Sequence, residues 1–400
     1  MSEFEQDIRA KLKPVPSVDL VTSFVGTNWL LDVTKIRQIE SYDDANFHVE
    51  TVCKTSGASG VYLVKFYNAI ETDNAEILEG LSHMLARINE KIQSTVKVPS
   101  IVQPCIKQGD EAPQTNYVYL DSCPVVDGTE KKVAVRVFSW IAGTTLSRVT
   151  PTLLLFVQLG QGIGHVSASL HNFDHPAFHR VHLWDLKNID MSIKELAYVD
   201  NLDVQQAILA IHTAFKVVVE PLASVLPCAV VMGDCNDANV IVTEDEPREV
   251  AGLIDFSDAV STWRVNEIAI AMAYALLTSM GKTHPHLALG ALLAGFVSVQ
   301  PLTKTELAVL PILIQVRLSI SVMIGACAIS KEPDNEYLKL HAIPGRDAIL
   351  LMNKTSNEVH SNYYKAINTL FSKKENKVTV GVDLLNTDVY SALVFKYYKM

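Results

Sequence analysis

The chain has 400 residues, of which 48% are apolar and 20% are charged, a composition that is typical of a globular protein and excludes an extended disordered one. Its formal net charge is −10, from 34 basic and 44 acidic residues, and no long basic cluster interrupts the sequence. Partners such as nucleic acid or an anionic membrane surface are therefore not expected.

Cysteine usage and the amino-terminal residues indicate the compartment. The six cysteines include no CxxC pair, which favours reduced thiols over a zinc site or a disulfide framework. Residues 1–13 lack the apolar core of a signal peptide. We therefore expect a cytoplasmic protein.

Extended segments dominate the first third of the chain. Pro14 and Pro16 should end a short amino-terminal arm. Runs of β-branched and apolar residues then predict strands, with one amphipathic helix over residues 74–93 between them. The predicted strands cover residues 36–39, 46–53, 60–67, 100–104, 117–120 and 132–138.

Helical patterns dominate the remainder. A helix is predicted over residues 152–172, two helices over 190–226, and further helices with polar linkers over 331–400. Residues 307–329 are long and apolar enough to suggest a membrane span. However, Arg317 at the middle would cost about 2.5–3.5 kcal/mol on insertion, so we predict a buried helix. Arg317 then needs a partner, either a substrate carboxylate or an acidic side chain such as Glu267.

The most informative stretch is residues 228–258. Two short apolar runs separated by the charged segment 244–249 predict a β-hairpin. The polar residues Asp234, Asn239 and Asp255 fall at the ends of the strands in this stretch.

The spacing of these residues suggests phosphoryl transfer. That reaction needs a carboxylate to orient the acceptor hydroxyl and accept its proton, together with oxygen ligands for Mg²⁺. Kinase catalytic loops place an Asn five residues after their Asp, which is the separation of Asp234 and Asn239. Asp255, followed by Phe256, fits a second metal ligand after an apolar segment.

Several motifs, in one order over about residues 30 to 340, resemble the aminoglycoside phosphotransferase and choline kinase superfamily and, within it, the hydroxylysine kinases. Met232 departs from the pattern, since the family usually carries His two residues before the catalytic Asp. The motifs are SYDDANFHV (41–49), LVK (63–65), FDHP (173–176), LWDL (183–186), GDCNDAN (233–239) and DFSD (255–258).

This resemblance implies an α+β, protein-kinase-like fold with two lobes. Residues 1–139 would form a small antiparallel-sheet lobe that binds the nucleotide. Residues 140–400 would form a large helical lobe with the catalytic loop and the acceptor site. The implied reaction moves the γ-phosphoryl group of GTP, or ATP, to the hydroxyl of 5-hydroxy-L-lysine with Mg²⁺, without an obligate protein partner. Alternatives are a kinase for choline, homoserine, methylthioribose or an aminoglycoside, and a non-catalytic nucleotide-binding protein.

The resemblance also implies roles for individual residues. Asp234 would be the base, Asn239 and Asp255 would hold Mg²⁺, and Lys65 would contact phosphates and pair with Glu79, or alternatively Glu76. Taken alone, Lys65 would be read as an ordinary lysine at a strand end, and it is the stretch at residues 228–258 that favours the phosphate contact. The remaining predicted contacts are Asn46 at the nucleotide phosphates, Ser139 and Ile141 at the nucleotide base, and Asp258, Trp184 and Arg317 near the acceptor. Asp258 could instead assist the metal or cap its loop, and Trp184 could instead be a core anchor.

Overall fold

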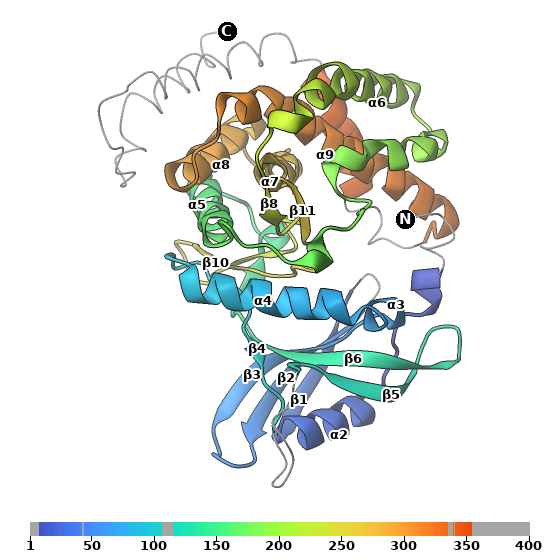
Figure 1. Ribbon diagram of the computed structural model, residues 1–400, viewed down its shortest axis with the longest axis vertical. Coiled ribbons are helices and arrows are strands. Elements are labelled where there is room, and N and C mark those ends of the chain that lie inside the picture. Colours follow the sequence, from blue (N-terminus) through green and yellow to red (C-terminus); the bar gives the residue numbers. More distant parts are fainter. Residues whose placement is uncertain (1–7, 42–43, 106–114, 335–338, 340, 354–400) are drawn as a thin grey trace.

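The computed structural model describes residues 8–41, 44–105, 115–334, 339 and 341–353. These residues form a smaller lobe around an antiparallel sheet and a larger, mostly helical lobe (Figure 1). The predicted α+β fold with two lobes is therefore confirmed. The predicted boundary between residues 139 and 140 stays a prediction, although the last long strand of the smaller lobe ends at Ser139.

The sheet of the smaller lobe is antiparallel, in the order β1-β2-β3-β6-β4, with β5 also paired to β6. Its register places Asn46 opposite Lys65, so both residues lie at the same end of neighbouring strands. The strands are β1 (Leu31–Ile39), β2 (Ala45–Cys53), β3 (Ser59–Phe66), β4 (Ile101–Val102), β5 (Val118–Pro124) and β6 (Glu130–Ser139).

Two helices cover this sheet. Alternating side chains of β2, including Phe47 and Val49, pack with Trp29 and with α2 (Val18–Asn28) in one hydrophobic core. Helix α4 (Ala75–Lys91) lies between the sheet and the larger lobe (Figure 1). Its apolar face belongs to the core of the larger lobe, so α4 fastens the two lobes together.

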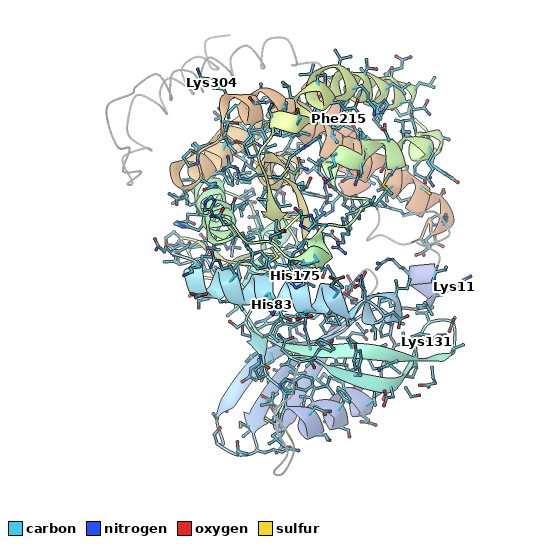
Figure 2. The ribbon with its side chains drawn as sticks, viewed as in Figure 1. Lys11, His83, Lys131, His175, Phe215 and Lys304 are labelled. Atoms are coloured by element: carbon cyan, nitrogen blue, oxygen red, sulfur yellow. The ribbon has the colours of Figure 1, made fainter. Side chains whose placement is uncertain are left out.

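A close contact fixes α4 against the larger lobe. His83 of α4 and His175 lie side by side at this junction, with ring centroids 5.3 Å apart (Figure 2). A Cβ atom on Gly80 would come within 3.0 Å of Ala177 and His175. A side chain at position 80 would therefore press on both residues, and glycine allows this close approach without such a shift.

The larger lobe is built on helices whose sequence is apolar on nearly every side. All residues of α7 (Val265–Ser279) are buried, as are most of α9 (Lys304–Lys331), which begins with a Thr303–Glu306 capping box. The other helices are α3 (Ala69–Thr72) in the smaller lobe and α5 (Leu153–Ser169), α6 (Leu202–Ala214) and α8 (Pro285–Val299) in the larger. Shorter helical turns are Leu146–Arg148, Pro176–Phe178, Leu186–Met191, Ile193–Tyr198, Phe215–Val219 and Glu220–Val225.

Two small sheets carry the stretch from residue 228 to 263. The predicted hairpin is β9 (Val240–Val242) with β10 (Val250–Leu253), extended by β7 (Thr144–Thr145). Strand β8 (Cys228–Val231) pairs instead with β11 (Val260–Trp263). The loops that follow β8 and β10 are thereby held next to each other.

Among the described residues, two helical segments are long and apolar enough to cross a membrane by length and composition alone, Leu202–Val225 and Lys304–Lys331. The apolar window of Lys304–Lys331 is 89% buried inside the protein. Such burial is what the core helix of a globular lobe shows, and it supports the prediction that residues 307–329 form a buried helix. The predicted helices beyond residue 353 lie outside the described residues.

Candidate active site

Asp234 lies in the loop that follows β8, and its position depends on Gly233. Gly233 has φ of 82°, a left-handed conformation that costs glycine little. A Cβ atom at this position would stand 2.6 Å from the backbone oxygen of Asp258. The missing side chain lets the 255–258 segment pack directly against the loop that carries Asp234.

The Asp234 carboxylate is held on both oxygens. Oδ2 accepts hydrogen bonds from Nδ2 of Asn236 at 2.8 Å and Nδ2 of Asn239 at 3.0 Å. Oδ1 accepts one from Arg317 at 2.7 Å. The side chain keeps 21% of its exposure, so a hydroxyl could still reach it. Burial raises the pKa of Asp234 to about 6. The positive charge of Arg317 opposes this shift, and the negative charge of Asp258 adds to it.

The two predicted metal ligands, Asn239 and Asp255, lie on adjoining segments, since the Ile254 N–H donates to the Asn239 carbonyl at 2.9 Å. Asp255 has φ of 59°, an unusual conformation for a residue other than glycine and one that often marks a functional site. Its contacts with Ser257 and Lys65 use Oδ1, and 43% of its side chain is exposed.

These side chains suit a hard divalent cation. Carboxylate and amide oxygens are the ligands that Mg²⁺ accepts, usually one or two from the protein and the rest from substrate phosphates and water. Among the described residues, no group of three or more His, Cys, Asp and Glu side chains could hold a metal alone. Asn239 and Asp255 could hold a cation only together with such additional ligands.

Lys65 is buried and does not have the expected partner. Its Nζ lies 2.7 Å from Oδ2 of Asp44 and 3.7 Å from Oδ1 of Asp255. Burial disfavours the ammonium, but these two carboxylates outweigh it and raise the pKa of Lys65. The predicted pairing with Glu79 is corrected: Glu79 and its alternative Glu76 are exposed on α4, and the described ion pairs of Lys65 are with Asp44 and Asp255. Asp44 belongs to the loop before β2, which the register brings next to Lys65.

The predicted nucleotide contacts surround this lysine and the last strand. The side-chain oxygen of Asn46 is buried and has no hydrogen-bond partner among the described residues. The Ser139 N–H donates to the Ser100 carbonyl at 2.8 Å, so this donor is already used. Ile141 is buried against Gly252. A nucleotide base bound beside the end of β6 would therefore have to hydrogen-bond backbone groups other than the Ser139 N–H.

The predicted acceptor residues meet at a narrow crevice. Trp184 and Asp258 line it together with His182 and Gly233. Burial and the neighbouring Asp255 raise the pKa of Asp258 to about 6, and His182 Nε2 lies 3.4 Å from its Oδ1. Arg317 also reaches this region: its guanidinium lies over the Trp184 ring, 4.7 Å from the ring centroid. The alternative prediction, an ion pair of Arg317 with an acidic side chain, holds among the described residues, but the partner is Asp234 and not Glu267.

Several contacting residues were not anticipated from sequence. Arg180 donates to the backbone oxygens of Ser257 and Ala259, at 2.7 and 3.0 Å, and so braces the loop that carries Asp255. His341 hydrogen-bonds Asp237 of the catalytic loop at 2.8 Å. Asp44 pairs with Lys65. Of these three, Asp44 carried a sequence signal, because it lies in the motif at residues 41–49.

Glu267 of α7 holds the start of the loop that carries Asp234. Its Oε2 accepts the Met232 N–H at 2.5 Å, and its Oε1 is buried without a hydrogen-bond partner among the described residues. Burial raises the pKa of Glu267 to about 7, which fits a carboxyl that retains its proton. The loop is thus anchored through the backbone of Met232, whatever the side chain at that position.

Glu267→Gln should flatten the dependence of stability on pH. Between the ordinary pKa of 4.5 and the raised value of about 7, the folded chain holds a proton that the unfolded chain releases. Stability must therefore fall as pH rises through this interval, by up to about 3 kcal/mol for this one group. Urea unfolding at pH 5 and pH 7.5 should show a larger loss in the wild type than in the variant. Equal losses would mean that Glu267 is ionised in the folded chain.

Comparison with known proteins agrees with this geometry. The sequence profile of the phosphotransferase enzyme family matches residues 35–297. The chain is 28% identical to hydroxylysine kinase of Xenopus laevis over 346 residues, covering 83% of this chain and 88% of the relative. Hydroxylysine kinase of Mus musculus is 27% identical, with coverages of 84% and 89%.

Solved structures share the fold at lower identity. An aminopropanol kinase associated with a microcompartment has a TM-score of 0.61 at 17% identity, over 85% of this chain and 97% of that one. Amicoumacin kinase, in a complex that contains AMP-PNP and Ca²⁺, has a TM-score of 0.60 at 15% identity, over 87% and 96%. With the family profile matching well over half of its length, the chain belongs to the phosphotransferase enzyme family and is a phosphotransferase that acts on a hydroxyl group.

Proposed function

We propose that this enzyme transfers the γ-phosphoryl group of GTP to the 5-hydroxyl of hydroxy-L-lysine. The observation that carries the proposal is the constellation of Asp234, Asn239, Asp255 and Lys65, found in a chain that matches hydroxylysine kinases over more than four fifths of its length. The proposed acceptor rests on these relatives, which are hydroxylysine kinases, and the proposed donor GTP rests on the sequence resemblance to that family.

Each residue would have a distinct task in the reaction. Asp234 would orient the acceptor hydroxyl and accept its proton on a carboxylate oxygen. Lys65 would contact the phosphates beside Asn46, which stands opposite it in the sheet register. Asn239 and Asp255 would hold Mg²⁺, which when bound offsets phosphate charge. The catalytic loop need not move far, because Gly233 already packs against Asp258.

The surroundings of Asp234 argue against a choline-like acceptor. Quaternary ammonium groups are recognised by cages of aromatic rings. Trp184 and Tyr274 could form part of such a cage, but the guanidinium of Arg317 lies over both rings, 4.7 and 5.3 Å from their centroids. An acceptor with a small primary ammonium and a carboxylate, such as hydroxylysine, does not need that space.

The test is a turnover assay of the purified chain with Mg²⁺ and GTP or ATP. The acceptor panel should contain 5-hydroxy-L-lysine, lysine, 1-amino-2-propanol and choline. Lysine lacks the hydroxyl, whereas 1-amino-2-propanol has the same hydroxyl beside an aminomethyl group. We expect turnover with hydroxylysine and none with lysine or choline. Faster turnover of another amino alcohol would reassign the acceptor, and no turnover with any would favour a nucleotide-binding protein without activity.

The location follows from the same proposal. Hydroxylysine and nucleoside triphosphates are small soluble substrates, and a cytoplasmic enzyme without a membrane or obligate protein partner would suit them. Fractionation of cells that express the full chain would test this. Recovery of the enzyme with membranes would contradict it and would direct attention to the exposed segment Leu202–Val225.

A further inference from the structure

Arg317 is a buried cation that lies against the proposed base. It comes from the middle of α9, and its side chain is only 2% exposed. Its Nη2 donates to Oδ1 of Asp234 at 2.7 Å and to the hydroxyl of Tyr274 at 3.0 Å. One nitrogen thus connects the proposed base to helix α7.

The guanidinium is itself held in place on several sides. Nη1 donates to the Trp184 carbonyl at 3.4 Å, and the rings of Trp184 and Tyr274 lie against the guanidinium. The guanidinium of arginine is planar, stacks on aromatic rings and donates hydrogen bonds in fixed directions. A lysine at this position could not make the same set of contacts. Because α9 is buried along most of its length, this arrangement is rigid.

The carboxylate of Asp234 is therefore hydrogen-bonded through both of its oxygens. Arg317 holds Oδ1, while Asn236 and Asn239 hold Oδ2. Rotation of the carboxylate about its Cβ–Cγ bond would break at least one of these hydrogen bonds. A base whose oxygens are fixed in this way keeps its lone pairs aimed at the acceptor hydroxyl.

We propose that Arg317 is a positioning residue that fixes the carboxylate of Asp234 for proton transfer, rather than a ligand of the acceptor carboxylate. This inference rests on the proposed function of Asp234 as the base. Burial argues against direct binding, because a side chain that is 2% exposed and already shared between Asp234 and Tyr274 offers the acceptor little surface. The acceptor carboxylate would then be bound elsewhere.

A double-mutant cycle on kcat separates positioning from a general structural role. Arg317→Gln should lower kcat about 100-fold and leave both KM values within about threefold, because a misplaced base costs rate and not binding. Arg317→Lys should have a kcat about tenfold higher than that of Arg317→Gln, since lysine keeps the positive charge but lacks the planar guanidinium. Combined with Asp234→Asn, Arg317→Gln should cost nothing further, because the residue through which it acts is already lost.

Arg264→Gln provides a matched control. Arg264, at the start of α7, pairs with the buried carboxylate of Glu306 on α9, with its Nη2 2.7 Å from Oε2. It makes no described contact with Asp234. Its loss should lower Tm and leave kcat within about threefold. Thermal unfolding of all variants shows whether each one is folded.

The outcomes are distinct. A folded Arg317→Gln enzyme with near wild-type kcat, losses that multiply in the double variant, or a raised acceptor KM at unchanged kcat would each overturn positioning by Arg317. A wild-type chain without turnover would overturn the proposed function and this inference together. An active wild type in which Asp234→Asn also retains kcat would contradict the base assignment and, with it, the reason for a positioning residue.

Discussion

Asp234→Asn should lower kcat by about 10³-fold, because an amide cannot accept the proton of the acceptor hydroxyl and general-base catalysis contributes about 10²–10⁴-fold. Nucleotide affinity should change little, since in the proposed reaction the phosphates would contact Lys65 and the metal ion. The amide oxygen can still accept the hydrogen bond from Arg317. However, the charge that compensates this buried guanidinium is lost, so Tm should fall by several degrees.

The measurement is steady-state turnover with the acceptor that the panel identifies, beside calorimetric Tm. Asp237→Asn makes the same chemical change in the same loop, at a carboxylate that pairs with His341, and should retain kcat within about tenfold. Retention of kcat within about tenfold by folded Asp234→Asn would exclude Asp234 as the base.

Asp255→Asn should abolish the metal-dependent part of nucleotide binding. Mutation of a residue that only orients a metal ligand lowers metal affinity by about 10–100-fold. Removing the charge of Asp255, a proposed ligand itself, should lower metal affinity at least as much. Asparagine tolerates the left-handed conformation of residue 255 and can still accept hydrogen bonds from Ser257, which makes it a better choice than alanine. Kinase turnover should fall with metal affinity.

Titration calorimetry of nucleotide with and without Mg²⁺ measures this effect. The wild type should bind more tightly with Mg²⁺, whereas the variant should bind equally in both conditions. Asp258→Asn is the companion variant, because its carboxylate lies in the same segment and also lines the crevice. An unchanged metal dependence in Asp255→Asn, together with its loss in Asp258→Asn, would make Asp258 the main ligand.

Local sequence was sufficient for several features of this protein. The β-branched runs of the smaller lobe, the hairpin at residues 240–253 and the apolar helix around Arg317 are encoded by neighbouring residues. The order of motifs indicated the family. Asp234 and Asn239 are in contact because they are five residues apart in one loop. Contacts between residues this close in the chain can be predicted from sequence.

Tertiary structure alone decided which partners the charged residues take. Lys65 contacts Asp44 and Ser257, and Ser257 is 192 positions away, while Glu79 at the expected spacing points to solvent. Arg317 lies 83 positions from Asp234 and pairs with it rather than with Glu267. Periodicity reveals which residues of a helix are buried, but not which residue of another element stands opposite. A buried charge binds whatever counter-charge packing brings within reach, and packing depends on the whole chain.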